Sequence, residues 1–364
     1  MDSIVNAAIQ HGSLEKRSFD EFEGTDKLKI VVLGTGGGGN NTINRLHHIG
    51  IEGAELIAAN TDKQDLQKLE GDITKILIGA KLMRGLGAGG FPEQGEKAAE
   101  ASRHELADLL ADTHLLFLTA GMGGGTGTGS APVIAEIARD QGAIVVAIVT
   151  FPFNLERTRL NVARAGIDRL RKVADTVIVL DNNKLVQYVP NLPIDKAFSV
   201  ADEVVARAVK GITETIMEPS LINLDFADIK AVLGGGKVAV ISVGDGEGPD
   251  KVERAVENTL AQPLLEVSYD DATGALIHIT GGEEMTLGEA NRVGELITKE
   301  LRADASVTWG ARVEPSLKEK IQVIAILTGI KSPNILSTCE DDSRTGAFVY
   351  TEEFHRWSRG LPEV

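Results

Sequence analysis

The chain has 364 residues, 43% of them hydrophobic, which is enough to bury a large core and to form about two domains. Its 37 Lys and Arg stand against 53 Asp and Glu, and the resulting net charge of -16 argues against a nucleic-acid backbone as the main partner. The single cysteine, Cys339, excludes an intrachain disulfide and a cysteine zinc cluster, and no apolar run reaches the roughly 18 residues of a membrane span.

Residues 28–194 form the first predicted domain, after an N-terminal extension of residues 1–27. Strand patterns alternate with helical patterns, with strands expected at 29–33, 54–59, 75–78, 115–119, 144–150 and 176–180 and helices at 41–49, 94–111, 131–140 and 161–173. Nearly continuous Val, Ile and Leu strands between helices predict an α/β fold with a Rossmann-like parallel sheet covered on both faces. Such a sheet binds ligands at the carboxyl ends of its strands.

A long helical pattern over residues 195–219 follows, with apolar residues at three- and four-residue spacing. We interpret it as a central helix that joins two domains. Beyond it, residues 220–332 predict a smaller α/β domain, with strands at 237–243, 275–280, 306–311 and 321–328 and helices at 249–262 and 287–301. Residues 333–364 read as a polar tail.

Two glycine-rich loops stand between a strand pattern and a helical pattern. The first reads GTGGGGNN at 34–41, and the second reads GMGGGTGTGS at 121–130. Helix N-termini present unpaired N–H groups and a positive dipole end, and glycine lets this backbone approach an anion closely. Two such loops predict a nucleotide whose phosphates are held between them.

The first loop alone also fits a dinucleotide fingerprint, because Gly34, Gly36 and Gly39 satisfy GxGxxG. An NAD-type oxidoreductase is therefore an alternative. Such an enzyme expects an acidic residue at the end of the second strand, and here Asp62 comes two residues late. It also has no use for a second glycine-rich loop, and a Walker GxxxxGK[ST] motif is absent.

Five motifs in order resemble the FtsZ/tubulin superfamily, and FtsZ, in its archaeal form, more than tubulin. They are GTGGGGNN at 34–41, NTD at 60–62, GLGAGG at 85–90, GGGTGTG at 123–129 and NLDFAD at 223–228, and the resemblance covers residues 28–332. It implies a tubulin/FtsZ-like fold and a GTP-dependent, self-assembling cytoskeletal GTPase of cell division. A GTP-binding homologue that co-assembles with a related paralogue and hydrolyses weakly is a further alternative.

The resemblance also implies the residues that bind GTP or GDP. The glycine loops and the NTD motif would surround the phosphates through Gly37, Gly38, Gly39, Asn40, Asn41, Asn60, Gly123, Gly124, Gly125, Thr126, Gly127 and Thr128. Ala88 and Gly89 would approach the terminal phosphate, with Phe91 where the family has asparagine. Glu156 and Arg159 would contact the ribose, with Arg157 as the alternative arginine.

The family reads the base from the long helix, at the positions of Phe198 and Asp202. A carboxylate can accept two hydrogen bonds from the N1–H and amino group of guanine, whereas adenine offers no such donor pair. Phe198, one helical turn earlier, can stack on the purine. The plain alternative is a solvated helix acid at Asp202 and a core residue at Phe198.

The acidic segment NLDFAD implies catalysis at a subunit junction. By sequence alone it reads as a capped turn, since Asn and Asp bond their own backbone. The resemblance implies instead that this loop enters the nucleotide pocket of the next subunit, where Asp225 and Asp228 orient the attacking water and Asn223 assists. Two carboxylates beside a triphosphate imply Mg²⁺. A pocket on one end and a catalytic loop on the other predict a head-to-tail filament.

The predicted partners are therefore further copies of this chain, a related co-assembling paralogue, and a membrane adaptor protein bound through the tail. Neither nucleic acid nor direct insertion into a membrane is expected. We expect a cytoplasmic protein located at the division site, in a midcell ring.

Overall fold

The computed structural model describes residues 28–184, 191–217, 226–234, 237–261 and 269–330, so Cys339 and the predicted tail lie outside the described residues. Ten strands form one sheet in the order β3-β2-β1-β4-β5-β6-β7-β10-β8-β9. In the N-terminal part every pairing is parallel, as predicted. Its strands are β1 (Ile30–Thr35), β2 (Ala54–Asn60), β3 (Thr74–Leu77), β4 (Leu115–Gly121), β5 (Ile144–Phe151) and β6 (Thr176–Asp181).

The C-terminal part extends this sheet instead of building a separate one. Strand β7 (Lys237–Gly246) pairs in parallel with β6 at Thr176, Val177 and Ile178. Strand β10 (Ile321–Thr328) lies antiparallel between β7 and β8 (Gly274–Gly281), and β9 (Ser306–Val313) runs parallel to β8 at the edge. The fold is therefore of the α/β class, with one mixed sheet that runs through both parts of the molecule.

Helices cover both faces of the sheet, as the sequence predicts. In β1, Val31 and Leu33 enter one core cluster while Ile30 and Val32 enter the other. The first cluster contains α5 (Pro92–Ala101), α6 (Arg103–Leu109), α7 (Thr126–Asp140), α8 (Thr158–Leu170), α12 (Lys251–Leu260) and α13 (Leu287–Thr298). The second contains α2 (Gly36–Ile49), α3 (Lys63–Gln67), α10 (Ile194–Met217) and α11 (Phe226–Leu233). The described residues also form three short helical segments, α4 (Ala80–Met83), η1 (Asn154–Glu156) and η2 (Pro315–Leu317).

The prediction of one helix over residues 94–111 is wrong. The helix is interrupted at Ser102, which caps the end of α5 and the start of α6 with φ -107° and ψ 13°. The hydroxyl of Ser102 accepts a hydrogen bond from the backbone N–H of Gly79 over 3.0 Å, so it serves another segment and not the helix.

Two other helices begin earlier than predicted, inside the glycine loops: α2 begins at Gly36 and α7 at Thr126. The missing side chains make this possible. A Cβ atom on Gly39 would lie 2.3 Å from the carbonyl oxygen of Thr119, and one on Gly127 would lie 2.7 Å from that of Gly121. The glycines therefore let each helix N-terminus reach the edge of the sheet.

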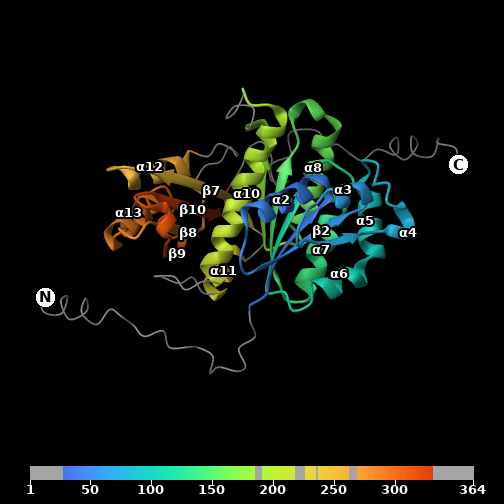
Figure 1. Ribbon diagram of the computed structural model, residues 1–364, viewed down its shortest axis with the longest axis horizontal. Coiled ribbons are helices and arrows are strands. Elements are labelled where there is room, and N and C mark those ends of the chain that lie inside the picture. The colour runs from blue at the N-terminus through green and yellow to red at the C-terminus, as the bar shows by residue number, and fades with distance from the viewer. Residues whose placement is uncertain (1–27, 185–190, 218–225, 235–236, 262–268, 331–364) are drawn as a thin grey trace, which may run out of the picture.

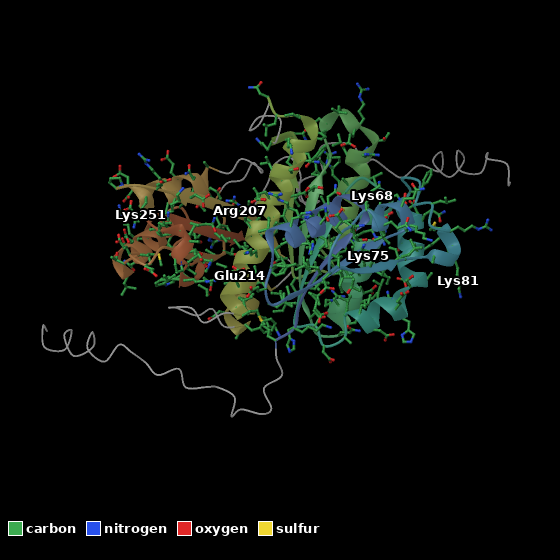
Figure 2. All side chains as sticks on the ribbon, viewed as in Figure 1. Lys68, Lys75, Lys81, Arg207, Glu214 and Lys251 are labelled. Atoms are coloured by element: carbon green, nitrogen blue, oxygen red, sulfur yellow. The ribbon has the colours of Figure 1, made fainter. Side chains whose placement is uncertain are left out.

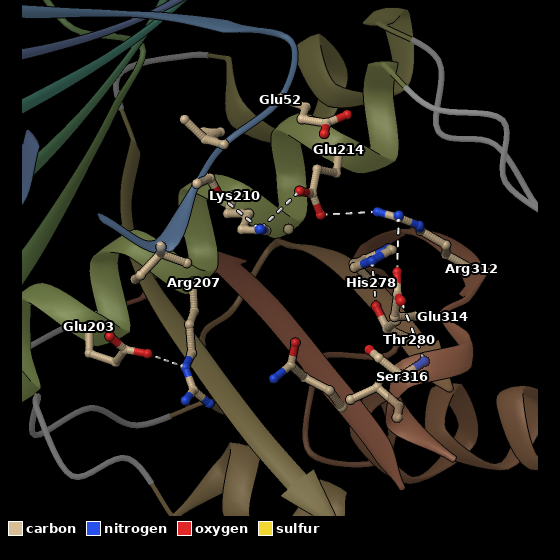
Figure 3. Close-up of a pocket in the computed structure, with 16 residues that line it drawn as sticks. Glu52, Glu203, Arg207, Lys210, Glu214, His278, Thr280, Arg312, Glu314 and Ser316 are labelled. Atoms are coloured by element: carbon tan, nitrogen blue, oxygen red, sulfur yellow. Dashed lines mark hydrogen bonds and ion pairs between the residues drawn. The ribbon is translucent and has the colours of Figure 1, made fainter. Parts of the chain in front are cut away.

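Helix α10 lies between the two parts of the molecule (Figure 1), and Figure 2 shows Arg207 and Glu214 on it. An ion pair fixes it on one side and a hydrogen bond fixes it on the other. Arg312 of β9 donates to Glu214 over 3.0 Å, and Lys210 donates to the carbonyl of Gly50, at the end of α2, over 2.8 Å. These groups line a cleft of about 760 Å³. Figure 3 shows Glu214 facing Arg312, which also lies 3.3 Å from Glu314.

This cleft is larger than the cavity at the glycine loops, but most of its charged side chains pair with one another. Arg207 contacts Glu203 at 2.7 Å and Lys210 contacts Glu214 at 3.3 Å. We therefore look for the functional site at the glycine loops. Among the described helices, none is long and apolar enough to cross a membrane.

Candidate nucleotide site

A cavity of about 480 Å³ opens at the carboxyl ends of β1, β4, β5 and β6, where a parallel sheet binds its ligands. The first turns of α2 and α7 and one side of α10 enclose it. Its lining residues are Gly36, Gly37, Gly38, Asn41, Gly121, Met122, Gly124, Gly125, Thr126, Gly127, Thr150, Pro152, Glu156, Arg159, Asn182, Phe198, Ala201 and Asp202.

The two glycine loops meet in backbone contact at the floor of this cavity. Gly36 has φ +70°, and a Cβ atom there would lie 2.8 Å from the backbone nitrogen of Gly127. A hydroxyl pair ties the same two segments together, Thr35 to Ser130 at 2.6 Å, and a second pair at 2.6 Å ties Thr61 of the NTD motif to Thr126. Two helix N-termini thus point at one cavity, which is the arrangement that binds phosphate groups.

Most of the predicted nucleotide residues line this cavity. They are Gly37, Gly38, Asn41, Gly124, Gly125, Thr126, Gly127, Glu156, Arg159, Phe198 and Asp202. The other predicted residues are not among its lining residues, and they are Gly39, Asn40, Asn60, Ala88, Gly89, Gly123 and Thr128.

Several residues of the second group hold the walls in place. With its amide nitrogen turned toward the sheet, Asn40 donates to the carbonyl of Gly34 over 3.0 Å and accepts from Asn60 over 3.1 Å. Thr128 accepts from the backbone N–H of Gly123 over 2.9 Å. Ala88 is buried beside Gly125, where an added Cβ would lie 2.9 Å from its methyl group.

The predicted ribose segment forms one rim of the cavity. Glu156 accepts from the backbone N–H of Phe153 over 3.0 Å and from Arg159 over 2.6 Å. Arg159 lines the cavity, whereas Arg157 is outside its lining, so the geometry favours Arg159 over Arg157 for the nucleotide-contacting arginine. Sequence reasoning missed Asn182, although its position directly after β6 is the signal that would have found it.

The predicted purine-reading residues border a second hollow of about 460 Å³, which we call the annex. It is lined by Asn41, Asn44, Arg45, His48, Phe198, Ser199 and Asp202. Phe198 is 39% exposed and meets Phe153 edge to face at 5.6 Å, so it is not a core residue.

Asp202 is not a fully solvated helix acid either, because it is partly buried and accepts a hydrogen bond from Thr42 over 2.9 Å. Burial raises the pKa of Asp202 to about 6, while the Thr42 hydroxyl and the charge of Arg45 act in the opposite direction. The carboxyl group thus stands between the cavity and the annex, where a planar base could contact it.

The structure places Asp228 away from this cavity. Asn223 and Asp225 lie outside the described residues, and Asp228 occupies the first turn of α11. Phe226, at the start of α11, packs edge to face on His114 at 6.2 Å. Both line a hollow of about 550 Å³ together with Lys29 and Gly142. His114 directly precedes β4, Lys29 directly precedes β1, and Gly142 comes just before β5. Helix α11 therefore begins at the amino ends of the strands, opposite the cavity.

No group of three or more His, Cys, Asp or Glu side chains suited to a metal ion occurs in the part of the chain that the structure describes. The carboxylates that line the cavity, Glu156 and Asp202, already bond Arg159 and Thr42. A divalent cation would therefore depend on oxygen ligands from a bound nucleotide or from another molecule.

Comparison with known proteins agrees with this geometry. Residues 29–190 match the GTPase domain of the tubulin/FtsZ family, and residues 236–331 match the C-terminal domain of the FtsZ family. The chain is 55% identical to cell division protein FtsZ 2 of Methanocaldococcus jannaschii over 98% of its own length and 94% of the relative's. It is 51% identical to FtsZ 2 of Haloferax volcanii, over 92% and 85% of the two chains.

A solved structure, the empty FtsZ dimer of M. jannaschii, superimposes with a TM-score of 0.79 at 43% identity and covers 93% of this chain and 98% of that one. The likeness extends through both the GTPase part and the C-terminal part. The chain therefore belongs to the tubulin/FtsZ family, as a GTPase of its archaeal FtsZ branch.

Proposed function

We propose that this protein is a GTP-hydrolysing cytoskeletal protein of cell division whose copies assemble head to tail, each copy completing the active site of its neighbour. One observation carries the proposal: the cavity lies at the carboxyl ends of the strands, and Asp228 lies at their amino ends. A single copy cannot bring both to one nucleotide. The family membership removes the NAD-type oxidoreductase as an alternative.

In this proposal the nucleotide lies along the cavity from α7 to α10. Backbone N–H groups at the starts of α2 and α7 bind the phosphates, since both helix dipoles favour negative charge there. Ala88, whose methyl group lies beside Gly125, and Gly89 approach the terminal phosphate. Arg159 and Glu156 hold the ribose, and the carboxylate of Asp202 accepts two hydrogen bonds from guanine.

Hydrolysis then requires the neighbour. Asp225 and Asp228 of the neighbouring copy orient the attacking water in line with the terminal phosphate, and Asn223 assists. Mg²⁺, held by phosphate oxygens and by oxygen ligands of the incoming loop, would neutralise the repulsion between those carboxylates and the triphosphate. The contact is heterologous, so repetition extends it into a protofilament.

The proposed organisation has a GTP-binding domain at residues 28–194, a central helix at 195–219, a C-terminal domain at 220–332 and a tail at 333–364. The bounds of α10 and the two family matches support these divisions. We further propose that the tail binds a membrane adaptor protein at the division ring and that a related paralogue can join the filament. Measuring where the tagged protein lies in dividing cells, with and without residues 333–364, tests the first of these.

The direct test of the proposed function is the dependence of GTP turnover on protein concentration. Because each site needs two copies, turnover per molecule should rise steeply above a threshold concentration and then level off. Phosphate release and light scattering measured on the same samples should rise together. Turnover per molecule that stays constant across the whole range contradicts shared sites. Assembly without appreciable turnover would instead favour the weakly hydrolysing homologue.

A further inference from the structure

The carboxylate assigned to guanine is held by a hydroxyl group from a different helix. Thr42 of α2 donates through Oγ1 to Oδ1 of Asp202, on α10, over 2.9 Å. The same hydroxyl lies 3.4 Å from the carbonyl oxygen of Gly38. A hydroxyl has one hydrogen, and a charged acceptor makes the shorter and stronger bond, so this hydrogen belongs to Asp202. Thr42 is only 4% exposed, which keeps water from replacing it.

This hydrogen bond leaves the rest of the carboxylate free to meet a base. Oδ2 of Asp202 has no hydrogen-bond partner in the described part of the chain, and Asp202 lines both the cavity and the annex. An ionised carboxylate has about four acceptor positions, so Oδ1 can accept from Thr42 and from a ligand together. The bond to Thr42 therefore fixes the plane of the carboxylate without using up its acceptors.

We propose that Thr42 is a positioning residue for guanine selection, which holds the carboxylate of Asp202 ionised and in the orientation that accepts from N1–H and the 2-amino group. This inference rests on the nucleotide placement proposed above. The nucleotide placement proposed above gives Thr42 no role of its own, yet its side chain bonds Asp202 on α10.

The ionisation of Asp202 matters because the two purines need opposite partners. An ionised carboxylate only accepts, which suits guanine. A protonated carboxyl group donates through one oxygen and accepts through the other, and this pattern suits N1 and the 6-amino group of adenine. Burial already raises the pKa of Asp202 to about 6, and the Thr42 hydroxyl acts against that rise. Removing the hydroxyl raises the pKa of Asp202. As the pH is lowered, the carboxyl group of the variant therefore becomes protonated sooner than that of the wild type, and guanine selection is lost sooner.

The other charged groups near Asp202 set the controls. Arg45 and His48, both on α2, share the annex with it. Arg45 also donates to Glu203 of α10 over 2.7 Å, so its guanidinium is held from the same helix that carries Asp202. Because the imidazole of His48 also lines the annex, each pH series should be repeated with His48→Gln.

The test compares Thr42→Val, which keeps the shape and removes the hydroxyl, with Thr42→Ser, which keeps the hydroxyl. Dissociation constants of fluorescent GTP and ATP analogues are measured on the full chain between about pH 5 and pH 8. Thr42→Val should bind GTP about tenfold more weakly at pH 7, because a carboxylate that is no longer held in place would lose about one of its hydrogen bonds to guanine. As the pH is lowered, its preference for GTP over ATP should disappear at a higher pH than that of the wild type. Thr42→Ser should retain both properties.

The results separate this inference from the proposed function. Wild-type protein that binds GTP no better than ATP contradicts the assignment of Asp202 to guanine. A normal wild-type preference, together with a Thr42→Val protein that matches it at every pH, overturns the role of Thr42 alone. Equal losses in Thr42→Ser and Thr42→Val also overturn it, since the hydroxyl would not be the cause. Thr42→Ala is the second hydroxyl-free variant if the valine protein does not fold.

Discussion

Replacing Asp228 by alanine should reduce GTP hydrolysis about 100-fold or more while leaving GTP binding unchanged. Asp228 lies in the first turn of α11, at the end of the strands opposite the nucleotide cavity. The side chain therefore lies away from a nucleotide bound to its own copy, and in the proposed filament it faces the terminal phosphate bound to a neighbour. Filaments of this variant should assemble and persist, because the reaction that weakens the junction is blocked. Phosphate release, nucleotide binding and sedimentation measure the three properties.

Asp140→Ala is the matched control for this variant. Asp140 is an exposed carboxylate at the end of α7, just before β5, so it lies at the same end of the sheet. Its replacement should leave hydrolysis unchanged. Alanine favours a helix, and the loss of an acid from the first turn of α11 removes a helix-dipole contribution of about 0.3–1 kcal/mol. An Asp228→Ala protein that no longer binds GTP would show that this residue belongs to its own copy's site.

Gly36→Ala should lower the free energy of unfolding by about 3 kcal/mol and weaken GTP binding at least about tenfold. Two costs add at this position. The backbone of Gly36 has φ +70°, where an alanine is strained, and the new methyl group would lie 2.8 Å from the backbone of Gly127. Relief of that contact requires the two glycine loops, which we propose bind the phosphates, to move apart. Urea unfolding and titration with a fluorescent GTP analogue measure the two effects.

Gly50→Ala separates the two costs. Gly50 ends α2 with φ +77°, so alanine is strained there as well, but nothing lies within 4 Å of the added methyl group. This variant should lose about 1–2 kcal/mol of stability and bind GTP normally. Equal losses of GTP binding in the two variants would mean that the close approach of the loops is not needed.

Much of the candidate site could be predicted from sequence, because its parts follow local rules. Apolar runs predicted the ten strands of the sheet, and two glycine loops that each follow a parallel strand were expected at the same edge of it. The order of the strands in the sheet was not predictable, since periodicity identifies a strand but not its neighbours. The three register pairs that join β6 to β7 leave no mark in the pattern of either strand.

Long-range side-chain contacts set the remaining limit. The bond between Thr42 and Asp202 spans 160 residues, and the one between Arg312 and Glu214 spans 98. Neither has a sequence signature. Motifs also do not separate a residue that lines a cavity from one that supports its wall, as Asn40 and Thr128 do here.

The shared active site can be tested most directly by mixing two inactive proteins. Asp202→Ala lacks the purine contact but keeps the acidic loop, and Asp228→Ala keeps the nucleotide cavity but lacks the loop acid. In a filament of both, the cavity of an Asp228→Ala copy meets the intact loop of an Asp202→Ala copy. An equal mixture should regain up to about a quarter of wild-type hydrolysis, the share of such junctions in random assembly. A mixture no more active than the sum of its separate components, although it assembles, would contradict the account.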